Sequence, residues 1–233
     1  MDDEEPSAAR GPGWSFFTNH ALALIYIVQH PASTVREIAR GVDITERAML
    51  GILRTLDDER VIERTRDSRR NTYSVNFSRL ATFRRAAVAP LTPREFIEPL
   101  LETLLALSGD GVQRHSAPTQ AEDAPREAPT GGWGFFTNQL RVLIAVAIDN
   151  SRTIHDIGIG VGVTDRAAVA IVNQLEEEGL VARTREGRRN SYVIDFEAVR
   201  TSKRWSSGAW PFPHEIADVC VRGLRVIATR SAG

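Results

Sequence analysis

The sequence predicts a mainly α-helical chain with small β-hairpins, an α+β class, built from two tandem copies of one module. Three observations predict it. A long segment of the chain repeats without gaps, and in each copy apolar residues recur at helical spacing behind capping residues. In both copies a short alternation of apolar and polar residues then flanks an arginine-rich turn, which is typical of a hairpin.

The repeat is clearest at an aromatic motif near the start of each copy. Trp14-Ser-Phe-Phe-Thr-Asn19 recurs as Trp133-Gly-Phe-Phe-Thr-Asn138, 119 residues further along the chain. With that shift, residues 14–77 (the first repeat) align with residues 133–196 (the second repeat) without a gap. Of the 64 aligned positions 25 are identical, so the chain holds one unit twice.

Composition changes mark the boundaries of the predicted domains. Residues 1–13 read as a disordered acidic tail, and residues 108–132, rich in Pro, Ala, Gly, Thr and charge, read as a flexible linker. The first module then spans residues 14–107 and the second spans residues 133–230.

Composition also limits the class of protein. The chain has 233 residues, of which 42% are hydrophobic and 25% charged, and no apolar run approaches the about 20 residues that span a bilayer. The acidic N-terminus does not resemble a secretory signal, and the single Cys220 excludes an intramolecular disulfide. We therefore expect a cytoplasmic protein without membrane contact. The net charge of −1 argues against a nucleic-acid partner, but this average conceals local charge.

Local patterns predict three helices in each copy. In the first copy, Thr18-Asn19 caps a helix that Pro31 ends, and Thr34 to Glu37 form a capping box for a helix through Ala39 ended by Gly41. A tight turn follows, and Thr45 caps a third helix to about Glu59. The expected core residues of the first and third helices are Ala21, Leu24, Ile25 and Val28, and Ala48, Met49, Ile52, Leu53 and Leu56.

A hairpin follows the third helix. Strands are expected at 61–66 and 72–77 around a polar tip at 67–71. The second copy repeats every element: a capping box at 153–156, Thr164 as the third cap, and strands at 181–185 and 191–196 around 186–190. The elements of each copy follow in the order helix, helix, turn, helix, strand, wing and strand. This is the order of a winged helix-turn-helix, whose third helix can enter a DNA major groove.

The motifs resemble those of a known group. Thr-Glu-Arg-Ala at 45–48, Thr-Asp-Arg-Ala at 164–167, and Arg-Thr-Arg-x-x-Arg-Arg-Asn-x-Tyr at 64–73 and 183–192 resemble small bacterial winged-helix regulators, loosely MarR- or ArsR-like, which typically open with a Trp-x-Phe-x-Thr-Asn motif. Such regulators usually carry one module and dimerise. The resemblance implies that this chain is the same dimer fused into one polypeptide.

The hairpins carry the strongest functional signal. Residues 60–70 hold five arginines against two acidic residues, and residues 183–189 hold four against one, a net charge of +3 in each case. Such a tip suits contact with phosphates or insertion into a minor groove, although its charge could also only keep an edge strand soluble. The candidate residues are Arg66, Arg69, Arg70, Asn71, Arg185, Arg188, Arg189 and Asn190.

The third helices offer fewer polar groups. Their candidate DNA-facing residues are Thr45, Arg47, Leu50, Arg54, Thr164, Arg166, Val169 and Asn173. The related regulators usually place Gln-Arg-like residues where this chain has Leu50-Gly51 and Val169-Ala170, so only Arg47/Arg166 and Arg54/Asn173 remain to read bases. The two faces differ, so the preferred site is an imperfect palindrome. The acidic runs at 57–59 and 176–178 are expected to be solvated.

A stretch after each hairpin is the expected pairing element. Pro93-Arg-Glu95 matches Pro213-His-Glu215 at a shift of 120, and Pro99 either starts or kinks the first of the two helices that follow. Pairing within one chain gives a pseudo-dimer, and the alternative is a homodimer of four modules. The apolar residues at helical spacing are Phe96, Ile97, Leu100, Leu101, Leu104 and Leu105, and Ile216, Val219, Cys220, Leu224 and Ile227.

The remaining residues indicate no catalysis, metal or cofactor. The five histidines lack metal-ligand spacing, the cysteine pairs of metal-sensing ArsR proteins are absent, and no phosphate loop or nucleophile elbow occurs. Trp14 and Trp133, with the Phe pairs at 16–17 and 135–136, could line an effector pocket, but core packing is the favoured role.

We therefore expect a non-enzymatic, nucleoid-associated transcriptional regulator, a repressor, that binds double-stranded DNA; any small-molecule effector is left unidentified. Two alternatives stay open. The chain could be a winged-helix protein–protein adaptor that uses exposed Leu50 and Val169. It could also be an architectural DNA binder with little sequence readout.

Overall fold

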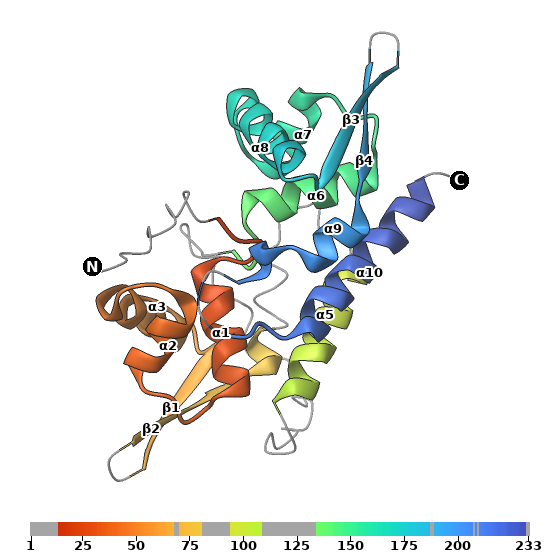
Figure 1. The fold of residues 1–233 in the computed structure, drawn as a ribbon. Helices are drawn as coiled ribbons and strands as arrows, with labels where there is room; N and C mark the ends of the chain where they lie inside the picture. The colour runs from red at the N-terminus through yellow and green to blue at the C-terminus, as the bar shows by residue number, and fades with distance from the viewer. Residues whose placement is uncertain are drawn as a thin grey trace, which may run out of the picture.

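The computed structural model describes residues 14–67, 70–80, 94–108, 134–186, 189–206, 208 and 210–231 (Figure 1). Most of them lie in helices, and the strands form two separate two-stranded antiparallel hairpins, which confirms the mainly helical α+β class. The element order is consistent with two helical modules, each with one hairpin. The predicted tail and almost all of the predicted linker lie outside the described residues.

Three capped helices open the first repeat, as predicted. They are α1 (Asn19–Gln29), α2 (Val35–Val42) and α3 (Glu46–Asp58). The hydroxyls of Thr18, Thr34 and Thr45 accept from backbone N–H groups of the first turns, and Thr34 and Glu37 form the predicted capping box.

The second repeat forms the same three helices. They are α6 (Asn138–Ile148), α7 (Ile154–Val161) and α8 (Asp165–Glu177), with Thr153 and Thr164 as caps. Thr137 stands at the N-cap of α6 but makes no capping hydrogen bond. Its hydroxyl donates to carbonyl oxygens of the first repeat instead, at 2.6 Å from Ser15 O.

Two details of the helices differ from the prediction. Gly41 does not end α2, which continues to Val42. The next residue, Asp43, is the C-cap and takes the left-handed conformation at φ 61°. A glycine stands at position 41 because a Cβ there would overlap the Tyr26 ring. Ala48 is exposed, because it lies in the solvent-facing first turn of α3; the buried residues of that helix are Met49, Ile52, Leu53 and Leu56.

The hairpins extend further towards their tips than predicted. They comprise β1 (Ile62–Asp67) with β2 (Arg70–Val75), and β3 (Val181–Glu186) with β4 (Arg189–Ile194). The strands include most of the predicted tips, since Arg66 pairs with Asn71 and Arg185 with Asn190. The predicted strand ends at Phe77 and Phe196 are wrong, because both residues are helical.

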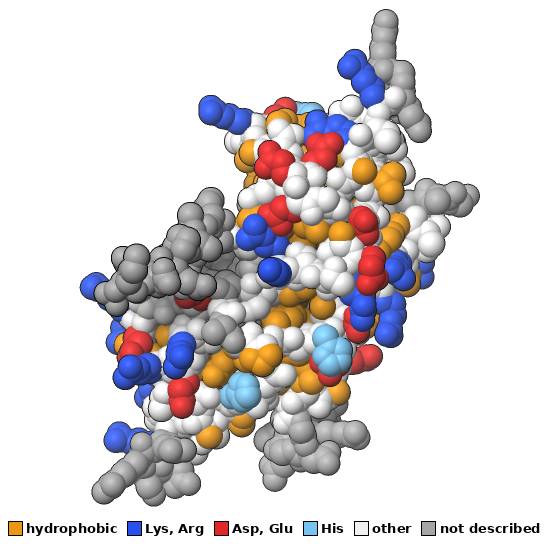
Figure 2. Space-filling view, in the orientation of Figure 1, with side chains coloured by type: hydrophobic (Ala, Val, Ile, Leu, Met, Phe, Trp, Pro, Cys, Tyr) orange, Lys and Arg blue, Asp and Glu red, His pale blue; other side chains and the backbone are white. Residues whose placement is uncertain are grey.

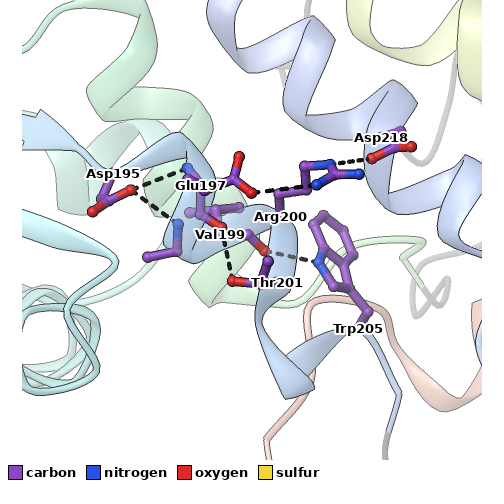
Figure 3. A network of polar contacts seen from close by, with 8 residues as sticks. Asp195, Glu197, Val199, Arg200, Thr201, Trp205 and Asp218 are labelled. Atoms are coloured by element: carbon purple, nitrogen blue, oxygen red, sulfur yellow. Dashed lines mark hydrogen bonds and ion pairs between the residues drawn. The ribbon is translucent and has the colours of Figure 1, made fainter.

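A short helix after β4 was not predicted. Helix α9 (Phe196–Thr201) begins at Asp195, whose carboxylate accepts from the N–H groups of Glu197 and Ala198. Helix η1 (Lys203–Trp205) follows, and the Trp205 indole donates to Val199 O at 2.8 Å. Figure 3 shows this network and the Arg200–Asp218 ion pair, 2.7 Å, which ties α9 to the last helix.

The two pairing stretches form helices that lie against each other. Helix α5 (Arg94–Leu107) includes Pro99, and it packs against α10 (His214–Ser231). The approach is close at Gly223, where a Cβ would come within 2.7 Å of the Phe96 ring. Among the apolar residues predicted at helical spacing in these two helices, Leu101 is half-buried and Leu105 is exposed. The others are buried: Phe96, Ile97, Leu100, Leu104, Ile216, Val219, Cys220, Leu224 and Ile227.

The two aromatic motifs meet through reciprocal hydrogen bonds. Thr18 N–H donates to Phe135 O and Thr137 N–H donates to Phe16 O, both at 3.0 Å, around a Phe17–Phe136 bridge. The hydroxyl of Thr18 donates to Gly134 O as that of Thr137 donates to Ser15 O, both at 2.6 Å. Each bond becomes its counterpart when the repeats are exchanged, so these contacts obey a local two-fold symmetry.

The arrangement of the elements follows the same symmetry. In Figure 1, α3 and α8 lie on the same side of the molecule, α5 and α10 lie on the other side, and the hairpins project at opposite ends. The buried apolar side chains of both repeats form one continuous cluster.

Candidate nucleic-acid interface

The predicted hairpin residues occupy equivalent positions in the two hairpins. Arg66 and Arg185 are exposed on the first strand of each hairpin, directly opposite Asn71 and Asn190. Arg70 and Arg189 begin the second strands. The side chains of Arg70 and Arg189, and the whole of Arg69 and Arg188, lie outside the described residues.

A buried tyrosine anchors the base of each hairpin. Tyr73 N–H donates to Pro31 O at 2.8 Å, and Tyr192 N–H donates to Asn150 O at 2.9 Å, so both hairpins attach to the loop after the first helix. Burial raises the pKa of Tyr73, although the Arg64 guanidinium and a hydrogen bond with Asn71 act in the opposite direction.

The third helices present the predicted residues to solvent. Thr45 and Thr164 are exposed caps, and Arg47 and Arg166 are exposed one turn or less beyond them. The apolar residues of these faces are exposed as well: 43% of Leu50 and 40% of Val169. Arg54 and Asn173 lie further along the same helices and are also exposed.

One predicted base reader already has a partner within the protein. The Arg183 guanidinium donates to Asn173 Oδ1 and to Glu176 Oε2, both at 2.6 Å. This bond holds the Asn173 amide against the base of the hairpin. The sequence signal was Asn173 and Glu176 three residues apart on one helix, but the strand that supplies Arg183 could not be placed beside them without the tertiary fold.

The acidic run that ends α8 is not simply solvated, which corrects the expectation for residues 176–178. Glu176 pairs with Arg183, and Glu178 pairs with Arg204 at 2.6 Å; only Glu177 is exposed. Glu178 also accepts from the Trp14 indole at 2.9 Å, while the Arg204 guanidinium lies 4.9 Å from the centre of the Trp14 ring. This cluster joins the start of the first repeat to the end of α8.

The aromatic motifs serve the core. Phe16 and Phe17 are fully buried, Phe136 is 8% exposed, and Phe135 packs against them half-buried. Trp205 and Phe212, which the sequence did not single out, complete the cluster around Phe17. Trp133 lies outside the described residues.

The first repeat presents more cations than the second on its second and third helices. Exposed Arg36 and Arg40 of α2 correspond to His155 and Ile159 of α7, and exposed Arg54 corresponds to Asn173. Figure 2 shows Lys and Arg side chains gathered at the left edge, over α2 and α3, and beside both hairpins. The exposed His155 imidazole lies 3.1 Å from Asp165.

Other kinds of site find little support in the described part of the chain. No group of three His, Cys, Asp or Glu side chains there could hold a metal ion. None of the helices described is long and apolar enough to cross a membrane. The Cys220 thiol is fully buried, and burial raises its pKa.

Comparison with known proteins gives no match to a protein-family model and none to a curated protein.

Proposed function

We propose that this chain is a DNA-binding transcriptional regulator, a repressor, in which each repeat forms a winged helix-turn-helix module. In this proposal α3 and α8 are the recognition helices and the hairpins are the wings. Helices α5 and α10 pair the two modules into a pseudo-dimer within one polypeptide. The chain is non-enzymatic and binds one duplex across both modules.

The observation that carries the proposal is the two-fold arrangement of the two repeats. The reciprocal Thr18 and Thr137 hydrogen bonds relate the repeats, and α3 and α8 lie on one side with a hairpin at each end (Figure 1). A duplex along that side can offer successive major grooves to the two helices and flanking phosphates to the hairpins. Exposed arginines occur at both positions in both repeats: Arg47 and Arg166 on the helices, Arg66 and Arg185 on the hairpins.

The helix faces favour phosphate contacts over extensive base reading. Direct readout needs side chains such as Arg, Asn or Gln that are free to reach base edges. Since Asn173 is bonded to Arg183, the remaining base readers are Arg47, Arg54 and Arg166. This supports modest sequence preference on an imperfect palindrome, or an architectural role at the limit of no preference.

A second candidate function rests on the apolar part of the same faces. Leu50 and Val169 occupy equivalent positions and are both about two-fifths exposed. Exposed apolar residues at symmetric positions suit contact with a protein partner, as in a winged-helix adaptor. Substituting both with aspartate would abolish binding of such a partner, whereas a DNA-binding function predicts only weakened DNA affinity.

The test is fluorescence anisotropy with a labelled duplex from the region upstream of the protein's own gene, against a scrambled duplex, across a salt series. Each phosphate that the protein neutralises adds about 0.9 to the steepness of log affinity against log salt. A steep slope with preference for the native duplex supports the regulator, and a steep slope without preference supports architectural binding. Absence of binding to either duplex at low salt contradicts the proposal and favours the adaptor.

A matched pair of variants tests the interface itself. Arg66→Ala/Arg185→Ala removes two exposed arginines from the hairpins, and Arg222→Ala/Arg230→Ala removes two exposed arginines from α10, on the other side. The first should lower affinity for both duplexes and reduce the salt slope by about 2. The second changes the net charge equally and should leave the slope near that of the unaltered protein. Equal effects would show that only overall charge matters.

A further inference from the structure

The acidic residues ahead of the first repeat have no part in the DNA-binding proposal. Residues 2–5, Asp-Asp-Glu-Glu (the acidic segment), follow one another, and the only charged residue between them and Trp14 is Arg10. Four successive negative charges are thus attached to the fold at Trp14, where the described part of the chain begins. A charge run with so little compensation nearby is attracted to the cations within its reach.

The attachment point lies on the side of the molecule that carries α3 and α8. The Trp14 indole donates to Glu178 at the end of α8, and its ring lies against the Arg204 guanidinium. The residues that follow lead into α1, which packs against α3. In Figure 1 this first described segment, in red, lies between α3 and α8. The acidic segment is therefore tethered beside the two proposed recognition helices.

The tether is long compared with these helices. Glu5 is nine residues before Trp14, and Asp2 is twelve residues before it. At about 3.3 Å for each extended residue, these stretches span up to about 30 and about 40 Å. Helices α3 and α8 have 13 residues each, which makes them about 20 Å long. Since the tether exceeds the length of either helix, charge decides where the acidic segment lies.

The first repeat offers a cluster of exposed cations on α2 and α3 (Figure 2). Arg40 of α2 and Arg47 and Arg54 of α3 (the cationic face) are exposed, and none of the three forms an ion pair with another described residue. Arg36, one turn before Arg40, pairs with Glu46 at 3.9 Å. That pair places this side of α2 beside the first turn of α3. Arg47 and Arg54 lie two turns apart on one side of α3, so the three arginines border one surface.

The second repeat offers less positive charge at the equivalent positions. Ile159, 68% exposed, and Asn173 stand where the cationic face has two of its arginines, and the Asn173 amide is bonded to Arg183. Of the three equivalent positions only Arg166 carries a cation. A segment with four negative charges is therefore attracted more strongly to the first repeat than to the second.

We propose that the acidic segment binds the cationic face and thereby competes with DNA for α3. Its carboxylates pair with the guanidinium groups of the first half of α3, because the exposed Asp57 and Asp58 repel them from the other end. Exposed ion pairs are individually weak, but the tether keeps the acidic segment at a high effective concentration. A duplex that engages both repeats displaces it. The competition rests on the proposed function, whereas the contact itself does not.

Paramagnetic relaxation enhancement in the full chain tests the contact without DNA. A nitroxide attached to Ser7→Cys reports where the acidic segment lies. The attachment is selective because the Cys220 thiol is fully buried and burial raises its pKa. At low salt we expect the amide signals around Arg40 and Arg47 to broaden more than their counterparts in the second repeat. High salt should remove the difference.

Two variants and one mixture decide the result. Glu4→Gln/Glu5→Gln removes half of the negative charge of the acidic segment, and Arg40→Gln/Arg47→Gln removes two cations of the face, so each should reduce the broadening. A nitroxide-labelled chain mixed with an isotope-labelled chain without nitroxide should show none, because the contact lies within one molecule. Equal broadening in both repeats, broadening that neither variant changes, or broadening in the mixture would overturn the inference.

DNA affinity then tests the competition. At low salt Glu4→Gln/Glu5→Gln should raise affinity about threefold, the value of two exposed ion pairs. Glu102→Gln/Glu215→Gln makes the same change of charge at exposed positions of α5 and α10, on the other side, and should raise it less. Equal effects of the two variants would overturn the competition. Absence of DNA binding with the contact intact would contradict the proposed function, whereas DNA binding without the contact would overturn this inference alone.

Discussion

The two repeats build the same framework from sequences that differ at most aligned positions. The identical residues include the threonine caps Thr34/Thr153 and Thr45/Thr164, and the Thr18/Thr137 pair that joins the repeats. These residues fix the starts of helices and the two-fold contacts. The differences lie on exposed helix faces, at two left-handed backbone positions and at buried positions such as Met49/Ala168 and Leu53/Val172. The framework is thus set by local capping and pairing, while the remaining surface is free to give each repeat its own chemistry.

The largest expected effect comes from breaking the contact that both repeats share. Gly223→Leu places a side chain where a Cβ alone would meet the Phe96 ring, so α5 and α10 must separate. Overpacking of this kind should lower the free energy of unfolding by about 2 kcal/mol, measured by urea denaturation. Arg222→Leu, at the exposed neighbouring position, is the control and should change stability by less than about 0.5 kcal/mol. If Gly223→Leu lowers the free energy of unfolding no more than the control does, α10 tolerates separation from α5.

A smaller loss is expected at the contact between the first repeat and the end of α8. Glu178→Gln keeps an oxygen that can accept from Trp14 but removes the negative charge that pairs with Arg204. Because both side chains of this ion pair are partly exposed, the cost should be about 1 kcal/mol, measured by the same denaturation. Glu177→Gln, at the exposed adjacent position, should have almost no effect. A high-salt measurement should narrow the difference between the two variants.

The sequence was sufficient wherever the determining interactions are local. Helix caps were predicted correctly because a threonine bonds to an N–H only three residues away, as at Thr45 and Thr164. The hairpins were predicted from alternation and a polar tip, but alternation alone cannot mark where a strand ends. Phe196 continued the pattern of Tyr192 and Ile194, yet Asp195 caps a helix there.

The sequence was insufficient for contacts between segments far apart in the chain. The bond from Arg183 to Asn173 and the cluster of Trp14, Glu178 and Arg204 depend on how helices and strands pack, which residue spacing does not encode. For the same reason, Asn173 was assigned as a candidate base reader although its amide is held by an arginine of the hairpin.

The two left-handed backbone positions of the first repeat allow a gain in stability. Asp43 and Arg60 have φ of 61° and 57°, and the second repeat has Gly162 and Gly179 at the equivalent positions. In this conformation a residue other than glycine is strained by about 1–2 kcal/mol. Glycine avoids this strain, but it loses more conformational entropy on folding, so the net gain in stability is smaller. Arg60→Gly should therefore stabilise the chain by about 0.5 kcal/mol in urea denaturation.

The same chemical change at a helical position should have the opposite sign. Arg54→Gly, exposed within α3, should destabilise the chain by about 1 kcal/mol, because glycine is unfavourable in a helix. Gly179→Arg should destabilise the chain, because an arginine at φ 71° is strained. Nothing lies within 4 Å of the missing Cβ, so the strain comes from the backbone conformation alone and not from a clash. If Arg60→Gly and Arg54→Gly both destabilise, the positive φ of Arg60 carries no strain.

The smallest effect is the most informative about the difference between the DNA-facing helices. Arg54→Asn gives the first repeat the residue of the second, and Asn173→Arg does the reverse. In the proposed interface each arginine adds one cation near phosphates, so the salt slope of DNA binding should fall by about 0.9 in the first variant and rise by about 0.9 in the second. Asn173→Arg also removes the acceptor of Arg183, which retains Glu176 as its partner at 2.6 Å.

The double variant Arg54→Asn/Asn173→Arg supplies the control, because its net charge is that of the unaltered chain. If both helices lie equally against phosphates, its slope returns to the original value and only the orientation on an asymmetric duplex reverses, which a duplex labelled at one end detects. If the slope follows the first repeat alone, so that Asn173→Arg has no effect, then α3 carries the electrostatic contact. The second repeat would then contribute mainly through its hairpin, consistent with the apolar Ile159 and Val169 that it exposes.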